Sequence, residues 1–336
     1  MDVSVIIINY KSCALVMQCI ESIVRETDAG TYEIIVVDND SQDGAREKIC
    51  SAFPAVRWID MGYNAGFARA NNAGMRIARG RYHLILNADT IITDRAISKS
   101  VTLLKNYPGA AGCGVQLLNT DGTTQISGAH FVTGGLNTLL PLPYLGRLVR
   151  FLGYRLKARV PSIQEVKASQ EVDWVVGAYM LIDSEAAGRA GLFDEDFFMY
   201  AEEIEWCARL RRLGKLILFS EPRVIHIGGG TSSDYYDTDI SENGKNLWNR
   251  KGRQVMVSNM LRIRKQFGIF WFLLILAAYL FTIPVFALGL LLEKLTGGSR
   301  YKYRWKDVKG YAANMLVLLR YTPRMLRNKP YFYKVA

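Results

Sequence analysis

Residues 3–10 read VSVIIINY, a β-branched apolar run that stops on two polar side chains. A short run of this kind is typical of a buried strand. Similar runs recur further along the chain and alternate with segments of helical character: 33–37, 56–59 and 82–86 for the strands, 14–25 and 66–78 for the helices. This alternation predicts an α/β fold with a mainly parallel, mixed sheet and crossover helices.

Polar residues follow three of these strands at the point where each strand ends: Asn9–Tyr10, Asp38–Asp40 and Asn87–Asp89. In open α/β sheets, ligands bind beyond the carboxyl ends of the strands, so we expect these clusters to converge on one crevice. No Gly-x-Gly-x-x-Gly motif follows the first strand and no P-loop occurs, which argues against a dinucleotide oxidoreductase or a P-loop ATPase. A diphosphate ligand would then need a metal ion, and Asp89 is the first candidate to bind it.

A second metal ligand is predicted at His226, which ends the apolar pair 224–225 and precedes 228–233, GGGTSS. Glycines at that place let backbone approach a ligand, while hydroxyl and amide groups can face phosphate. A histidine beside a glycine-rich turn is also common in ordinary loops, so the prediction depends on the combination with Asp89. His83 and His130 are interpreted as structural or exposed.

The segment 64–74, NAGFARANNAG, lies at a loop-to-helix junction. Its asparagines and glycines, Asn64, Gly66 and Asn71 among them, suit uncharged hydrogen bonding to a base, a sugar or phosphate oxygens. Asn64 and Gly66 could equally form only the turn.

A helix with acidic residues at its start is expected between 194 and Gly214. Trp206, Leu210 and Leu213 share one helical stripe, and Glu203, three residues before Trp206, falls on that same inward side. A carboxyl group on an apolar side has a raised pKa, as a general base requires, so Glu203 is the predicted base. Glu205 is expected to point outward and to form an ordinary surface pair with Arg209.

The middle of the chain is less regular. Residues 141–168, rich in proline, glycine and basic side chains, are predicted to be a flexible, acceptor-facing loop, and 172–182 a single buried strand. Five cysteines without a Cys-x-x-Cys spacing indicate reduced, cytosolic thiols, and the first residues lack the features of a secretory signal.

The charge of the chain is concentrated at its C-terminal end. Up to residue 240 there are 24 Lys/Arg and 28 Asp/Glu, whereas the remainder has 18 and 3. Residues 266–292 carry no formal charge and exceed the roughly 20 residues that span hydrocarbon. We therefore expect two domains, 1–240 and a basic, membrane-associated helical tail, 241–336.

Two geometries fit the apolar segment 266–292. Either both flanks are cytoplasmic and Thr282–Pro284 forms the bend of a re-entrant or in-plane hairpin, or the segment is a single span. We favour the hairpin. Residues 311–327 mix apolar and basic side chains, which is typical of an interfacial helix on the bilayer surface.

Taken together, these motifs resemble the family 2 glycosyltransferases with a GT-A fold, and within that family the rhamnosyltransferases of bacterial surface-polysaccharide assembly. The resemblance covers about residues 3–235 and rests on motifs that occur in the family's order: 3–10, 36–39, 64–74, 86–89, 172–181, 193–209 and 226–232.

The resemblance implies a role for each matching residue. Asp89 stands at the metal-binding last acid of the family's Asp-x-Asp, with Asn87 in place of the first, and His226 matches a histidine associated with the metal and diphosphate. Glu203 stands where the family usually has an aspartate as base, and Glu202 remains an alternative. The other implied contacts are to the donor, from Asn9, Asp38, Asn64, Gly66, Asn71 and Asn87, and to the acceptor, from Trp174, Gly177 and Ala178.

The predicted reaction is an inverting transfer of a sugar, with rhamnose suggested by the resemblance, from a nucleotide-diphosphate donor with Mg²⁺ or Mn²⁺. The basic, apolar tail favours a polyprenyl-diphosphate-linked saccharide as acceptor and an anionic membrane as partner, at the cytoplasmic face of the inner membrane. The alternatives are transfer to polyprenyl phosphate itself and a catalytically silent nucleotide-sugar-binding subunit. Nucleic acid is not expected as a partner, because the basic residues flank an apolar segment instead of interleaving with stacking aromatics.

Overall fold

The computed structural model describes residues 1–28, 31–156, 161–228, 246–296 and 303–335. Contacts divide the chain into two compact units. Among the described residues, the first unit comprises 1–131, 161–198 and 202–228, and the second comprises 132–156, 199–201 and 246–335. The second unit thus takes in a piece of the middle of the chain besides the tail. The assignment of 1–240 and 241–336 as functional domains stays a prediction.

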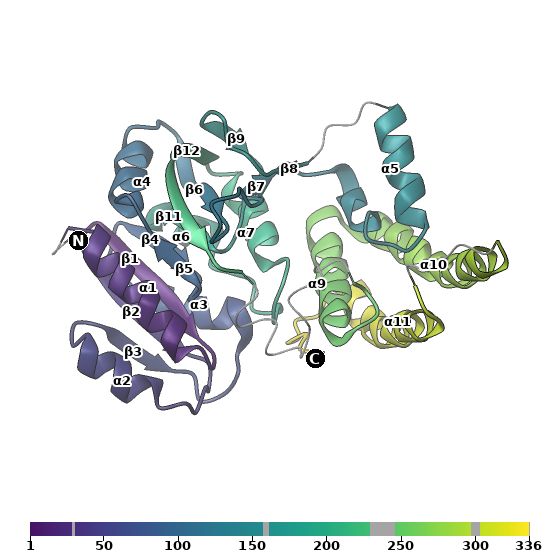
Figure 1. The fold of residues 1–336 in the computed structure, drawn as a ribbon, viewed down its shortest axis with the longest axis horizontal. Coiled ribbons are helices and arrows are strands. Elements are labelled where there is room, and N and C mark those ends of the chain that lie inside the picture. Colours follow the sequence, from purple (N-terminus) through teal and green to yellow (C-terminus); the bar gives the residue numbers. More distant parts are fainter. Residues whose placement is uncertain (29–30, 157–160, 229–245, 297–302, 336) are drawn as a thin grey trace. The chain divides into compact units, whose positions relative to one another are not determined.

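A nine-stranded mixed sheet forms the centre of the first unit, in the order β3-β2-β1-β4-β11-β6-β12-β5, with β9 paired to β12 (Figure 1). The predicted strands are present, and β1, β2, β3 and β4 are mutually parallel. The nine strands are β1 (Val3–Asn9), β2 (Tyr32–Asp38), β3 (Arg57–Asp60), β4 (Tyr82–Leu86), β5 (Thr90–Ile92), β6 (Ala110–Leu118), β9 (Gln170–Val172), β11 (Tyr179–Asp183) and β12 (Lys215–His226). The α/β architecture expected from the sequence is therefore confirmed.

Helices cover both faces of this sheet because side chains of a strand alternate between its faces. Val5 and Ile7 of β1 join a core cluster with Val16, Ile20 and Ile23 of α1. Ile6, between them, contacts the opposite helix, since a Cβ added at Gly74 of α3 would meet its side chain. The helices of this unit are α1 (Cys13–Glu26), α2 (Ala45–Ala52), α3 (Gly66–Ile77), α4 (Ala96–Lys105), α6 (Ser184–Ala190) and α7 (Glu202–Leu210).

The prediction of one strand over 172–182 is wrong. The segment is divided among β9, β10 (Trp174–Val175) and β11, and the three pieces have different partners. β9 pairs with β12, β11 pairs with β4 and β6, and β10 joins a separate small sheet with β7 (Gly128–Ala129) and β8 (Ser162–Ile163). The chain changes sheet at Gly177 and Ala178, which lie in the turn before β11.

The second unit is helical. Its elements are the 3₁₀ segment η1 (Thr133–Leu139) and the helices α5 (Leu145–Arg155), α9 (Arg250–Phe267), α10 (Ile269–Leu295) and α11 (Trp305–Leu326). Two tyrosines tie it together, because Tyr311 Oη donates to the carbonyl of Tyr279 (2.9 Å) and Tyr279 Oη to that of Thr138 (3.1 Å). Residues 141–168 therefore contain a helix and a short strand, contrary to the prediction of a flexible loop.

The apolar segment forms one helix. α10 continues through Pro284, so the predicted hairpin bend at Thr282–Pro284 is wrong. Proline removes one backbone hydrogen bond and disturbs a helix, but Tyr311 of α11 contacts α10 on both sides of this residue, at Tyr279 and at Phe286. In the described part of the chain, α10 is the one helix whose length and composition would allow it to cross a membrane, with a mean hydropathy of 2.4 over its most apolar window.

Candidate active site

The ends of β1 and β2 meet as expected. Asn9 and Asp38 are paired in register, and Asn9 Nδ2 donates to Asp38 Oδ1 at 2.7 Å. Ser41, which the sequence did not single out, accepts a second hydrogen bond from Asn9 Nδ2 (2.9 Å), while its backbone N–H donates to Asp38 Oδ2 (3.0 Å). All three residues are buried. The Asp38 carboxylate is therefore fixed at the carboxyl edge of the sheet.

A cavity of about 350 Å³ opens beside Asp38, at the ends of β2 and β3. Acidic side chains and one indole line much of it, namely those of Asp40, Asp43, Asp60 and Trp58. Trp58 Nε1 donates to Asp60 Oδ1 at 2.6 Å, so the ring is held in place. The sequence did not predict that Trp58 lines a cavity, because this residue appears there only as an apolar member of the strand 56–59.

The junction at 64–66 makes internal contacts. Asn64 Oδ1 accepts from the N–H of Gly66 (3.1 Å), and Asn71 Nδ2 donates to the carbonyl of Phe67 (3.1 Å). Gly66 has φ +73°, and a Cβ there would lie 2.1 Å from the carbonyl oxygen of Phe198. These contacts fit the turn interpretation of Asn64 and Gly66. Donor contacts by Asn64, Gly66 and Asn71 stay predictions.

Asp89 and His226, 137 positions apart in the sequence, lie together. Asp89 Oδ1 is 3.4 Å from His226 Nε2, and Asn87 Nδ2 is 3.4 Å from the same nitrogen. The pairing of β12 with β5 produces this arrangement, since His226 stands opposite Thr90, the residue after Asp89. Burial raises the pKa of the Asp89 carboxyl, but the hydrogen bond and the charge of His226 outweigh burial and hold that pKa below its ordinary value. Asp89 is therefore ionised at neutral pH.

Gln125 holds the other side of the histidine ring and was not predicted. Its Nε2 donates to the carbonyl of His226 (2.6 Å) and to Asn119 Oδ1 (2.7 Å), so its Oε1 is left to accept. His226 Nδ1 lies 2.9 Å from that oxygen and donates to it. This arrangement keeps a proton on Nδ1 whether the ring is charged or neutral, and Nε2 is the nitrogen that faces Asp89.

Gly177 and Ala178, which the sequence predicts to contact the acceptor, lie between the Asp89–His226 pair and helix α7. The carbonyl of Ala178 accepts from the backbone N–H of Asn87 (3.2 Å) and from Thr90 Oγ1 (3.3 Å). A Cβ added at Gly177 would lie 3.4 Å from the Phe67 ring and 4.0 Å from the Cβ of Glu203. Trp174 is half-buried in β10. Gly177 therefore lies next to both Phe67 and Glu203.

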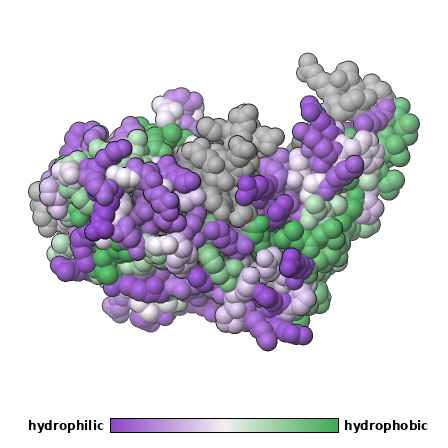
Figure 2. All heavy atoms as spheres, turned by 90° about the horizontal axis from the view of Figure 1, so that it is seen from below, coloured by the Kyte–Doolittle hydropathy of each residue, from purple (hydrophilic) through white to green (hydrophobic). Residues whose placement is uncertain are grey.

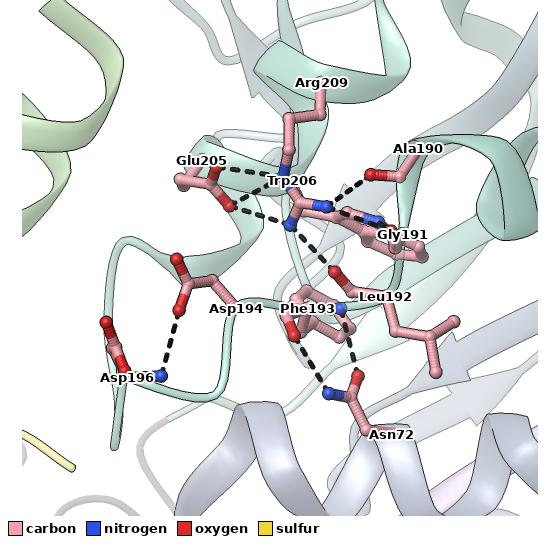
Figure 3. Close-up of polar contacts among 10 residues, drawn as sticks. All are labelled: Asn72, Ala190, Gly191, Leu192, Phe193, Asp194, Asp196, Glu205, Trp206 and Arg209. Carbon is pink, nitrogen blue, oxygen red and sulfur yellow. Dashed lines mark hydrogen bonds and ion pairs between the residues drawn. The ribbon is translucent and has the colours of Figure 1, made fainter. Parts of the chain in front are cut away.

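The acids of α7 differ in burial from what the sequence led us to expect. Glu202 is buried, Glu203 is half-buried, and Glu205, predicted to point outward, is buried. Glu205 and Arg209 form a bidentate pair at 2.8–3.1 Å, and the Arg209 guanidinium also donates to the carbonyls of Ala190 and Leu192 (Figure 3). The prediction of a surface pair is wrong, because the loop after α6 covers this side of α7.

The loop before α7 is fixed from the opposite side by α3. Asn72 Nδ2 donates to the carbonyl of Phe193 (2.9 Å), and the N–H of Phe193 donates to Asn72 Oδ1 (3.0 Å), as Figure 3 shows. Arg69 Nε adds a hydrogen bond to the carbonyl of Glu195 (3.0 Å). Residues 229–233 of the glycine-rich run lie outside the described residues.

Comparison with known proteins points to one kind of enzyme. Residues 4–163 match the family described as Glycosyl transferase family 2. The chain is 30% identical over 218 residues to the low-salt glycan biosynthesis hexosyltransferase Agl10 of Haloferax volcanii, which covers 63% of this chain and 62% of that protein. It is 26% identical to an N-acetylglucosaminyl-diphospho-decaprenol L-rhamnosyltransferase of Mycobacterium tuberculosis, over 55% of this chain and 63% of that protein. Rhamnosyltransferase WbbL of Escherichia coli is 23% identical, over 76% of this chain and 95% of that protein.

Solved structures agree in fold. A mannosyltransferase of Pyrobaculum calidifontis, PcManGT, superposes with a TM-score of 0.54 at 17% identity and covers 97% of this chain and 87% of that one. GalNAc-T7 superposes with a TM-score of 0.51 at 17% identity, and the match covers 67% of this chain and 43% of that one. The chain spans just under two thirds of the length of Agl10 and of the mycobacterial rhamnosyltransferase.

Proposed function

Because residues 4–163 match the family described as Glycosyl transferase family 2 and the fold agrees with that of solved glycosyltransferases, we propose that the protein transfers a sugar, with inversion, from a nucleotide-diphosphate donor to a lipid-linked saccharide. The observation that carries the proposal is the Asp89–His226 pair at the edge of the sheet where Asn9 and Asp38 also meet. Substrates of GT-A-like sheets bind beyond the carboxyl ends of the strands, where these residues lie.

The residues present fit a divalent cation such as Mg²⁺ or Mn²⁺. Asp89 offers an ionised carboxylate and His226 a directed imidazole nitrogen 3.4 Å away. The described residues contain no group of three or more His, Cys, Asp or Glu side chains that could hold a metal, so the remaining ligands are diphosphate oxygens and water. A cation held by Asp89 and His226 would supply positive charge against the departing nucleoside diphosphate.

Glu203 is the proposed base, with Glu202 as the alternative. Its carboxylate takes the proton of the acceptor hydroxyl as that oxygen attacks the anomeric carbon. The bond from the anomeric carbon to the diphosphate oxygen breaks in the same step, which inverts the configuration. Glu203 is half-buried and lies beside Gly177, a residue that the resemblance assigns to the acceptor side, which supports this role.

The substrates follow from the chemistry of the site and from the relatives. Asp38 and the cavity beside it suit the nucleoside end of the donor. Relatives named for rhamnosyl transfer and for a diphospho-decaprenol substrate suggest rhamnose as the sugar and a polyprenyl-diphosphate-linked saccharide as the acceptor. A lipid-linked acceptor agrees with the basic, apolar C-terminal helices, and the location proposed with it is the cytoplasmic face of the inner membrane.

Transfer assays test the proposal. Purified full-length protein is given a panel of nucleotide sugars with either a polyprenyl-diphosphate-linked saccharide or bare polyprenyl phosphate, and the linkage in the product is determined. We expect transfer to the saccharide only, and loss of at least about 100-fold in Asp89→Asn and Glu203→Gln, because the removed groups act in the transition state. Glu185→Gln, at an exposed glutamate of α6 to which no role is assigned, is the matched control.

Three results would contradict this function. Transfer to bare polyprenyl phosphate would identify a lipid-phosphate sugar synthase, and donor binding without turnover would identify a silent subunit. Full activity of Asp89→Asn would remove the proposed cation site.

A further inference from the structure

Helix α10 is apolar on two opposite faces, and only one is packed. Side chains at helical spacing along its length are buried within the second unit: Phe272, Ile275, Tyr279, Thr282, Phe286 and Leu290. The opposite face exposes between 43% and 73% of each large apolar side chain: Ile269, Phe270, Leu273, Leu274, Phe281, Leu288, Leu291, Leu292 and Leu295. A contiguous exposed face of this length is far larger than isolated surface leucines and indicates an interaction surface.

Helix α5 adds a second exposed apolar surface next to the C-terminal half of α10. Its Leu148, Phe151 and Leu152 are about half exposed, and arginines alternate with them. Tyr144, directly before α5, packs against Phe286 and against Gly289 of α10. Figure 2 shows an apolar, green band on the side of the molecule that carries these helices.

The charges of the neighbouring helices decide how α10 can meet a bilayer. Tyr311 of α11 is hydrogen-bonded to Tyr279, near the middle of α10, so Lys309 and Asn314 lie within a turn of that level. Asn314 accepts a hydrogen bond from Arg253 of α9 at 3.0 Å. If α10 spanned the membrane, these groups would lie near the bilayer centre, where each charge costs about 2.5–3.5 kcal/mol or more.

We propose that α10 lies in the plane of the membrane and inserts its exposed apolar face into one leaflet of an anionic phospholipid bilayer, with α5 as an accessory interfacial helix. In this orientation the exposed Lys306, Lys309 and Arg320 of α11 can remain in water or among the headgroups. Helices of this kind are buried about 5–10 Å into the interface. The inference deepens the proposed function, because a protein held on one leaflet meets the sugar-bearing end of a lipid-linked acceptor.

Depth measurement along α10 separates this geometry from a span. Nitroxide labels are attached to Phe270→Cys, Phe281→Cys and Leu292→Cys of the full-length protein on anionic vesicles, in a background with Cys13→Ala and Cys50→Ala; the other three cysteines are buried. Positions 270 and 292 are about 33 Å apart along a helix, the thickness of the hydrocarbon core. We expect equal, shallow depths for all three labels, about 5–10 Å below the phosphates. A profile with Phe281 deepest, or labels that remain in water, would overturn the proposal.

A second variant separates the anchor from the chemistry. Leu273→Glu with Leu288→Glu should abolish sedimentation with anionic vesicles and leave transfer to an acceptor analogue without its polyprenyl chain within about twofold. Vesicle binding that persists in this variant contradicts the anchor. If the three labels on α10 lie at equal, shallow depths but the protein transfers no sugar, the proposed function is contradicted and the membrane geometry of α10 is not.

Discussion

At the scale of single residues, the site depends on groups that approach each other only after folding. Gln125 contacts His226 although nothing in its surroundings marks it, because Gln125 lies between strands and has no motif of its own. Its Nε2 donates to the backbone carbonyl of His226 and to the side-chain oxygen of Asn119, which leaves its Oε1 to orient the imidazole. Partners of this kind fix both the tautomer and the direction of a ligating histidine.

Replacement of Gln125 by leucine should weaken cation binding at Asp89 and His226. The Nδ1 proton would lose its acceptor and the ring its orientation, which typically costs about 10–100-fold in metal affinity. Titration of the full-length protein with Mn²⁺, followed by electron paramagnetic resonance, measures this change. Gln18→Leu, the same change at an exposed position of α1, serves as the matched control. Unchanged Mn²⁺ affinity in the leucine variant would contradict the orienting role.

At the scale of elements, the sequence was sufficient where a local pattern and the tertiary environment agree. The β-branched runs and the helical segments between them predicted β1 to β4, α1 and α3, because each of these elements buries the face that its periodicity marks. The prediction failed over 172–182, where an apolar run is divided into three strands that pair with four other strands, with a turn at Gly177. It failed again for Glu205, because the loop after α6, which covers it, lies outside the helix pattern.

A buried carboxylate connects elements at the other edge of the sheet. Glu33 of β2 accepts hydrogen bonds from Ser4 Oγ of β1 (2.6 Å), from Arg57 of β3 (2.6 Å) and from the N–H of Arg79 (2.7 Å). Burial raises its pKa, but these donors together outweigh burial and lower the pKa from its ordinary value. A carboxyl with a lowered folded-state pKa stabilises the fold above its unfolded-state pKa of about 4.3, and this stabilisation is lost as pH falls through the folded-state value.

Glu33→Gln should therefore lower the free energy of unfolding at pH 7 by about 1–3 kcal/mol, because it replaces a charge-assisted acceptor by a neutral amide. The difference from the unchanged protein should shrink below about pH 4, where Glu33 itself becomes protonated. Urea unfolding of both proteins at pH 7 and at about pH 2.5, well below the ordinary pKa of a glutamate, measures this. Glu21→Gln, an exposed glutamate of α1, should show no such difference. A constant difference at both pH values would contradict the assignment.

At the scale of the whole molecule, composition predicted that the C-terminal part meets a membrane, but it could not give the geometry. An uncharged run of 27 residues fits a hairpin, a span and an in-plane helix equally well. Only the packing of α10 between α9 and α11 brings charged side chains level with its middle, and that packing depends on tyrosine hydrogen bonds far apart in the sequence.

An in-plane anchor implies that binding to the membrane depends on salt. The chain beyond residue 240 has 18 basic and 3 acidic residues, and α11 exposes Lys306, Lys309 and Arg320. Each basic residue near an anionic surface contributes about 1 kcal/mol, roughly fivefold in affinity, and this attraction weakens as salt screens it. Replacement of all three by glutamine should therefore lower affinity for anionic vesicles by up to about 100-fold at low salt, with little change on neutral vesicles.

Sedimentation with vesicles at increasing NaCl concentration checks this prediction, and the variant should also show a shallower salt dependence. The matched control removes the same charge from exposed positions of the first unit, Lys48→Gln, Lys105→Gln and Arg189→Gln. Since those side chains belong to the other unit, the control should retain nearly full affinity. An equal loss of vesicle affinity in both variants would mean that net charge alone attracts the protein to lipid. The basic residues of α11 would then not contact the headgroups specifically. Retention of affinity in both would leave the apolar face of α10 as the main source of binding.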